Sequence, residues 1–227
     1  TLRALKMHGG VPKQELNTEN VEAVTKGFSN LQKAIENMRY FNVPVLVAIN
    51  KFASDTDAEI AELTRLCDEF GVPVELNECW EKGGEGGTDM AKKVVELLEG
   101  PKPTPKFVYK LEDSFEDKVN KIVKTIYGGD GVIFTDKAKK QIKQLADWGL
   151  DRLPVCMAKT QYSLSDNPAL LGAPTGFTIT VSDIRVANGA GFIVCRTGDV
   201  MVMPGLPKRP AALNMDIEAD GTIKGLF

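Results

Sequence analysis

The sequence predicts an α/β protein in which a parallel-sheet, nucleotide-type unit is followed by a small, mostly antiparallel sheet module. Three observations support this fold class. Apolar runs of strand length alternate with segments whose apolar residues recur at helical spacing. The order strand, helix, strand, helix in the first half is typical of right-handed parallel units. After residue 176, alternating apolar residues separated by glycine or aspartate turns indicate antiparallel strands.

Local patterns place each expected element. Thr56 and Glu59 form a capping-box pattern that predicts a helix start, and Gly71 predicts the end of that helix. Elsewhere, helices are expected where apolar residues lie three or four positions apart, and strands where apolar runs lie between turn residues. In chain order we expect helix 17–40, strand 43–50 covered on both faces, helix 56–70, strand 72–76, helices 90–98 and 115–126, strand 132–134, helix 136–148, and strands near 177–184, 191–194 and 200–203.

Composition shifts suggest three domains. Residues 1–42 are expected to form the end of a large N-terminal domain plus a connecting helix, and 43–160 an α/β domain with parallel strands. Residues 161–227 are expected to form a small β-rich C-terminal domain. Because the chain opens with Thr1 and not Met, we expect it to be a piece of a longer protein.

Composition also narrows the classes of function. The chain has 227 residues, 43% of them apolar, which is enough to bury a core. A net charge of −3 disfavours nucleic-acid binding, and no apolar run approaches the roughly 20 residues that cross a membrane. Four scattered cysteines and one histidine disfavour a metal site and favour reduced thiols in a cytoplasmic protein.

Polar residues that follow the expected strands are the first candidates for ligand binding, since open α/β sheets bind ligands at the carboxyl ends of their strands. The Asn50 carboxamide can donate to and accept from a purine edge, and the Lys51 stem can lie over a base. The pair resembles the Asn-Lys-x-Asp motif of GTP-binding proteins, but Ala53 replaces its acid, which disfavours guanine. The alternative is that both residues only end a strand.

Two aromatic residues follow neighbouring strands and suggest a stacking slot. Phe52 and Trp80 could hold a flat heteroaromatic ring between them, although Phe52 alone could equally cap the core. Trp80 has polar neighbours and precedes the glycine-rich stretch Gly83–Gly87, which favours a position facing a ligand. We interpret those glycines as a flexible linker and not a phosphate loop, because no Walker motif occurs in the chain.

Two further segments are open to both structural and functional interpretations. His8, the only imidazole, precedes two glycines that permit either a tight turn or a close approach to a ligand. The proline-rich loop 203–210 carries two cations, yet its rigidity favours a structural role. No pair or triad of catalytic side chains follows from spacing, so we assign no catalytic residue.

Short motifs along the whole chain resemble the formate–tetrahydrofolate ligase family, and in particular the bacterial single-function type. The first of them looks like a signature segment of that family. The motifs are TLRALKMHGG at 1–10, KGFSNL at 26–31, AINKF at 48–52, KTIYG at 124–128, AKTQYS at 158–163, PTGF at 174–177, GAGF at 189–192, MPGLP at 203–207 and GLF at 225–227.

The resemblance implies roles for particular residues. Phe52 and Trp80 would sandwich the folate ring, Leu76 would pack beside it, and the turn 174–176 would approach adenine. Asn50 and Lys51 join the nucleotide contacts on strand-end position alone. The nucleotide-binding turn consists of Pro174, Thr175 and Gly176.

The resemblance also implies the reaction and its partners. Such ligases use ATP with Mg²⁺ to join formate to tetrahydrofolate through formyl phosphate, giving 10-formyltetrahydrofolate, ADP and phosphate. The phosphate-binding loop, the arginine that holds formyl phosphate and a monovalent-cation site would lie upstream of this chain, which is therefore expected to be inactive alone. The complete protein would be a homotetramer. The alternative is a noncatalytic nucleotide- or folate-binding module, while a GTPase-like domain is disfavoured.

Overall fold

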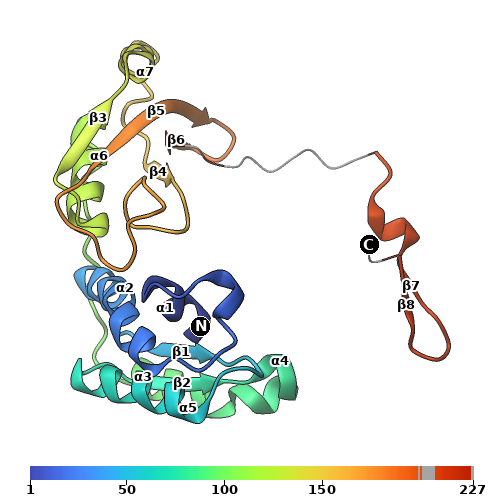
Figure 1. Ribbon diagram of the computed structural model, residues 1–227. Coiled ribbons are helices and arrows are strands. Elements are labelled where there is room, and N and C mark those ends of the chain that lie inside the picture. The colour runs from blue at the N-terminus through green and yellow to red at the C-terminus, as the bar shows by residue number, and fades with distance from the viewer. Residues whose placement is uncertain (199, 201–207, 226–227) are drawn as a thin grey trace.

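The structure, a computed structural model, describes residues 1–198, 200 and 208–225. Its described helices and strands form two α/β halves with separate hydrophobic cores, joined along the long helix α2, Val21–Tyr40 (Figure 1). The mixed α/β architecture with parallel strand pairs confirms the predicted fold class.

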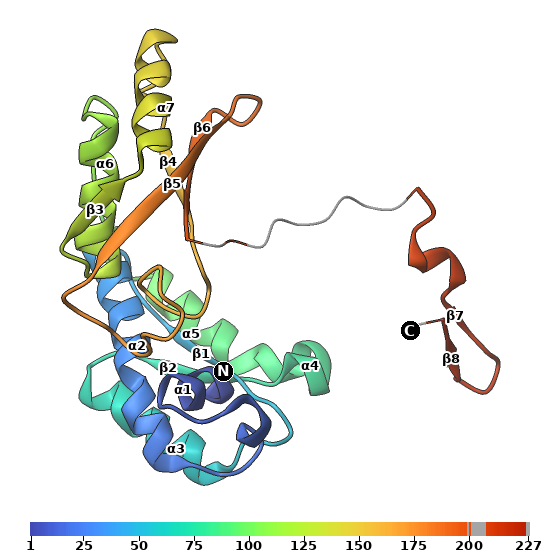
Figure 2. The same ribbon diagram turned by 45° about the horizontal axis from the view of Figure 1, so that its top comes forward.

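The first half is built on a two-stranded parallel sheet. Strands β1, Val47–Asn50, and β2, Val74–Asn77, pair in register so that Asn50 lies opposite Asn77. Figure 2 shows α2 and α3 beside this sheet and α1 close to the N-terminus of the chain. The other elements of this half are α1 (Leu2–His8), η1 (Lys13–Glu15), α3 (Asp57–Glu69), α4 (Cys79–Lys82), η2 (Gly83–Gly87) and α5 (Thr88–Leu98).

Strand β1 is shorter and more open than the apolar run 43–50 predicted. Val47 and Ile49 are buried, whereas Ala48 and Asn50 are exposed, so one face of the strand is covered and not two. The expectation of a strand buried on both faces is therefore wrong. Burial of alternate residues is the pattern of a sheet packed on one side only.

Strong local signals in this half are confirmed. Thr56 caps α3 through a complete capping box with Glu59. Gly71 adopts a left-handed conformation with φ 68° directly after that helix, as the predicted stop requires. The core of the first half gathers residues from α1, α2, β1 and α3, among them Leu2, Val24, Ile35, Ile49, Leu63 and Cys67.

The second half contains a mixed four-stranded sheet with the order β3-β5-β6-β4. Strands β5, Thr178–Ala187, and β6, Phe192–Thr197, form the antiparallel pair that the alternating pattern predicts. Strand β3, Gly131–Phe134, joins β5 in parallel, and β4, Val155–Ala158, joins β6 in parallel. The expected domain boundary at residue 160 thus falls between strands of one sheet.

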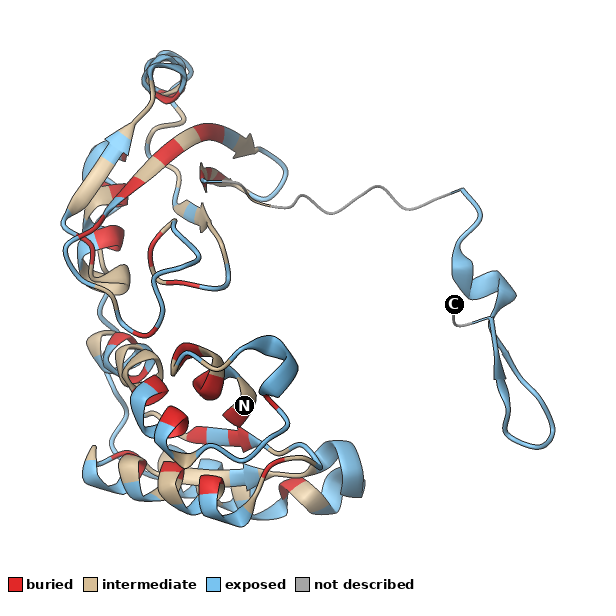
Figure 3. Ribbon diagram, in the orientation of Figure 1, coloured by how far each residue is buried: buried red, intermediate tan, exposed pale blue. Residues whose placement is uncertain are grey.

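Helices of the second half cover this sheet. They are α6 (Phe115–Ile122), the π-helical turn η3 (Val123–Tyr127) and α7 (Asp136–Asp147). Their buried residues meet those of the central strands in one core, which includes Phe115, Val119, Val123, Leu145, Ile179, Val181 and Ile193. Figure 3 shows buried segments concentrated in the two halves.

Residues 208–225 form a short turn and a hairpin. The turn η4, Ala211–Asn214, precedes the antiparallel strands β7, Asp216–Ile217, and β8, Ile223–Lys224, and every residue of this segment is exposed. All but the first residue of the predicted strand at 200–203 and most of the predicted loop 203–210 lie outside the described residues. Among the helices described, none combines the length and apolar character needed to cross a membrane.

Candidate functional site

The carboxyl ends of β1 and β2 form one polar edge. Asn77 Nδ2 donates to Asn50 Oδ1 across the strands at 2.7 Å. One residue further, Lys51 Nζ donates to Glu78 Oε1 at 3.0 Å. Lys82 also donates to Glu78, and these two hydrogen bonds, with Lys82 the stronger cause, lower the pKa of the Glu78 carboxyl. The strand-end residues therefore bind one another across the sheet edge.

Two aromatic side chains follow this edge and remain exposed. Phe52 comes directly after β1 and is 44% exposed, whereas Trp80, on α4, is 90% exposed. Leu76, the second-last residue of β2, is 36% exposed. Large apolar side chains that a fold leaves open at one edge of a sheet are available for stacking on a ligand.

Phe52 is held in place by two residues that sequence patterns did not indicate. Asp55 Oδ2 accepts the backbone N–H of Phe52 at 2.8 Å, while Asp55 Oδ1 is buried and has no partner in the described part of the chain. From α1, the Arg3 guanidinium carbon lies 5.5 Å from the centre of the Phe52 ring. A cation over one ring face leaves the other face for stacking.

The glycine-rich stretch after Trp80 is a 3₁₀ turn and not a linker without structure. The N–H of Glu78 donates to the carbonyl of Gly86 at 3.0 Å. A Cβ at Gly86 would lie 2.5 Å from the Glu78 carbonyl, so only glycine permits this approach. The turn closes against the end of β2 and fixes the helix that carries Trp80.

The predicted adenine turn lies at a different place. Pro174 and Thr175 line a cavity of about 300 Å³ against α2 and the end of η3. Gly176 follows in a left-handed conformation with φ 72°. The sequence-predicted nucleotide contacts thus fall into two groups, with Asn50 and Lys51 at the sheet edge and 174–176 beside α2. The cavity is lined by Ser29, Gln32, Lys33, Glu36, Tyr127, Gly128, Leu164, Ala173, Pro174 and Thr175.

Comparison with protein families identifies the chain. A family model described as formate–tetrahydrofolate ligase matches residues 1–227. The chain belongs to this family. The resemblance predicted from short motifs is therefore confirmed over the full sequence, and with it the general activity of joining formate to tetrahydrofolate.

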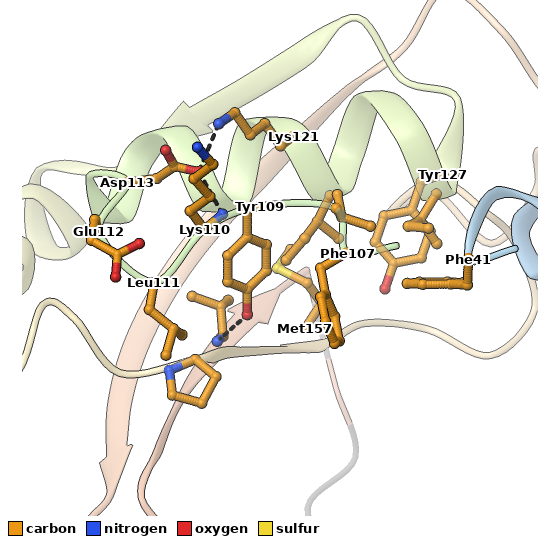
Figure 4. A pocket seen from close by; sticks show the side chains of 15 residues that line it. Phe41, Phe107, Tyr109, Lys110, Leu111, Glu112, Asp113, Lys121, Tyr127 and Met157 are labelled. Atoms are coloured by element: carbon orange, nitrogen blue, oxygen red, sulfur yellow. Dashed lines mark hydrogen bonds and ion pairs between the residues drawn. The ribbon is translucent and has the colours of Figure 1, made fainter. Parts of the chain in front are cut away.

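This member of the ligase family also has a larger groove in its second half, which Figure 4 shows from close by. The groove has a volume of about 1140 Å³ and contains none of the predicted site residues. Tyr109 spans it and accepts the N–H of Val155 at 2.9 Å, and Lys121 pairs with Asp113 at 2.6 Å at its edge. Lys110 and Glu112 also line it, and most of the remaining wall is apolar, with Phe41, Phe107, Leu111, Ile122, Ile126 and Met157.

The described residues of this ligase chain do not favour a reactive buried thiol or a metal site. Burial raises the pKa of Cys67 to about 11 and that of Cys195 to about 12, which keeps both thiols protonated near neutral pH. Cys79 and Cys156 are exposed and also free. Within the described ranges, histidine, cysteine and carboxylate side chains form no group of three that could hold a metal ion.

Proposed function

We propose that this chain supplies two binding surfaces of an ATP-dependent formate–tetrahydrofolate ligase. The folate wall consists of Phe52, Leu76 and Trp80, and the adenine wall consists of residues 174–176. Formate attacks the γ-phosphorus of MgATP to give formyl phosphate and ADP. The N10 amine of tetrahydrofolate then attacks the formyl carbon and displaces phosphate, which gives 10-formyltetrahydrofolate. In this proposal the chain binds and orients the two large substrates, and the groups that grip the phosphates lie outside these residues.

The observation that carries this proposal is the pair of exposed aromatic side chains after two paired parallel strands. Phe52 and Trp80 follow strands whose last residues, Asn50 and Asn77, lie opposite each other. A pteridine between the two rings would have both faces covered, and Leu76 would contact its rim. We assign these three residues to folate.

The nucleotide contacts are proposed on separate grounds. Pro174, Thr175 and Gly176 are assigned to adenine because a cavity of about 300 Å³ lies beside the first two. Asn50 and Lys51 stay proposed nucleotide contacts on strand-end position. No Gly-x-x-x-x-Gly-Lys-Ser/Thr motif occurs in the sequence, so we assign phosphate binding to other residues. The monovalent-cation site outside these residues and the inactivity of this chain alone are proposed from the family resemblance. The complete enzyme is proposed to be a cytoplasmic homotetramer.

The test is substrate kinetics of the complete ligase with Phe52→Ala and Trp80→Ala. Each change should raise the KM for tetrahydrofolate about fivefold or more, the equivalent of losing about 1 kcal/mol of stacking. The KM for ATP should stay within about twofold, because the adenine wall lies elsewhere.

Matched controls are available in the same chain. Phe107→Ala and Trp148→Ala remove exposed aromatic rings far from the sheet edge, at 77% and 63% exposure, and should leave both KM values unchanged. A tetrahydrofolate KM that does not move in either Phe52→Ala or Trp80→Ala would remove the stacking proposal. Calorimetric binding of tetrahydrofolate to the 227-residue chain without turnover would support a preformed folate half-site, whereas no binding would show that residues outside this chain shape the pocket.

A further inference from the structure

His8 connects the first half of the molecule to the loop before the adenine turn. It is the last residue of α1 and is only 9% exposed. The backbone N–H of Gly172 donates to its Nδ1 at 3.1 Å in a buried hydrogen bond that joins residues 164 positions apart. Burial lowers the pKa of His8 and so favours the neutral ring, whose Nδ1 accepts this hydrogen bond.

A second side chain holds the other polar backbone atom of Gly172. Asn30 Nδ2, on α2, donates to the Gly172 carbonyl at 2.9 Å. Gly172 itself has φ 70°, and a Cβ there would lie 2.8 Å from Ser29 Oγ. Gly172 is therefore pinned between α1 and α2, two residues before Pro174.

We propose that His8 is a positioning residue for the nucleotide, because its bond to Gly172 fixes the backbone that presents Pro174 and Thr175 to adenine. This inference rests on the proposed adenine contact. The loop between β4 and β5 lies against α1 and α2 in Figures 1 and 2. Gly172 belongs to this loop, so its position fixes where the following residues, Pro174 and Thr175, line the 300 Å³ cavity. His8 is a positioning residue and does not itself contact the substrate.

The two ends of α1 make this role separable from general damage to the helix. Arg3, in the first turn, lies over the Phe52 ring, whereas His8, in the last turn, binds Gly172. A variant that distorts α1 as a whole should weaken tetrahydrofolate and ATP together. Loss of the His8 bond alone should weaken ATP only.

The experiment measures KM and kcat for both substrates in the complete ligase with His8→Leu, His8→Asn and Asn30→Ala. We expect His8→Leu to raise the KM for ATP about tenfold, the effect of leaving one buried N–H unpaired. The KM for tetrahydrofolate and kcat at saturating ATP should stay within about twofold. His8→Asn should restore the wild-type KM, because a carboxamide oxygen can take the place of Nδ1.

Asn30→Ala provides the same readout without a change in α1, and Met7→Leu is the matched control on that helix. Equal increases in both KM values, a fall in kcat alone, or failure of His8→Asn to restore ATP affinity would overturn the proposal. If His8→Leu does not fold, which thermal melts would show, Asn30→Ala decides: an unchanged KM for ATP overturns the proposal, and a raised one supports it.

A further variant separates this proposal from the adenine assignment on which it rests. Thr175→Trp fills the cavity and should raise the KM for ATP if adenine binds there. A strong effect of Thr175→Trp with no effect of His8→Leu or Asn30→Ala would retain the adenine site and reject the His8 role. No effect of Thr175→Trp would reject both.

Discussion

At the scale of single residues, a buried ion pair joins α1 to α3 in the first half. Lys6 Nζ lies 2.8 Å from Glu59 Oε1, and both side chains are fully buried. Glu59 also accepts the backbone N–H groups of Asn20 and Thr56, and Lys6 donates to the carbonyl of Thr18. Because the two charges compensate each other away from water, removal of either leaves an uncompensated buried charge.

We expect Glu59→Gln to lower the free energy of unfolding by about 3 kcal/mol at pH 7, since Lys6 then lacks its counter-charge. Urea denaturation measures this value. Glu19→Gln is the control, because Glu19 is exposed and should change stability by less than about 0.5 kcal/mol. A loss of less than about 1 kcal/mol in Glu59→Gln would show that the pair contributes little.

The same carboxylate should make stability depend on pH. Burial alone raises the pKa of Glu59, but hydrogen bonds from Lys6 and from the N–H groups of Asn20 and Thr56 outweigh it, so the pKa lies below its ordinary value of 4.5. The stabilisation is complete above about pH 4.5 and is lost as the pH falls through the lowered pKa. The difference in unfolding free energy between wild type and Glu59→Gln should therefore stay constant from about pH 7 down to about pH 5 and narrow as the pH falls below about 4.5.

At the scale of elements, α1 and α2 cross at two glycines. A Cβ at Gly27 would overlap the carbonyl oxygen of Leu5, and one at Gly9 would overlap that of Ala23. The helices can approach this closely only because neither position carries a side chain. The crossing sets where α1 presents Arg3 and His8.

Gly27→Ala should therefore lower the free energy of unfolding by about 2 kcal/mol or more, despite the better helix propensity of alanine. Chemical denaturation of the purified chain measures the loss. Gly84→Ala, whose Cβ would meet nothing within 4 Å, should be close to neutral. Similar stability of the two variants would mean that the helices can move apart at no cost.

Sequence patterns predicted the positions of helices and strands better than they predicted which strands pair and where the pairing begins. The apolar run 43–50 predicted a strand, but pairing starts only at Val47, which lies opposite Val74. Pro73 has no N–H to extend the ladder before that point, although its carbonyl accepts from Val47 at 2.9 Å. The apolar pattern of one strand does not reveal which strand it will pair with, nor where that partner lacks an N–H for the ladder.

The sheet of the second half shows the same limit. Alternation predicted β5 and β6 as an antiparallel pair, but not that β3 and β4 add to it in parallel. Partner choice depends on contacts distant in sequence. The candidate site repeats this division: Phe52 and Trp80 were predicted from strand ends, whereas Arg3 and Asp55 were not, because only folding brings Arg3 to Phe52.

At the scale of the whole molecule, one face of α2 holds the two halves together. Asn30, Lys33 and Asn37 lie three and four positions apart, so they share a face of the helix. Asn30 donates to Gly172, Lys33 to the carbonyl of Thr125 at 3.0 Å, and Asn37 to the carbonyl of Ile126 at 2.8 Å. Each donor reaches the second half from a helix whose apolar residues belong to the first core.

Asn37→Ala should lower the free energy of unfolding by about 1–2 kcal/mol, because it leaves the partly buried Ile126 carbonyl without this donor. In hydrogen exchange, amides of η3 should exchange faster while those of β1 do not. Asn120→Ala is the control, since Asn120 donates within its own helix, to the carbonyl of Glu116. Uniformly faster exchange in both halves would contradict a local role at the junction.

All three acceptors at this junction are peptide carbonyls, which every amino acid supplies. Exchange of the Thr125 or Ile126 side chain leaves those acceptors intact, so a substitution at either position should not by itself remove the hydrogen bonds from α2. A second half taken from a distant homologue should for the same reason dock on this α2 without redesign of the contact, provided that glycine is kept at 172.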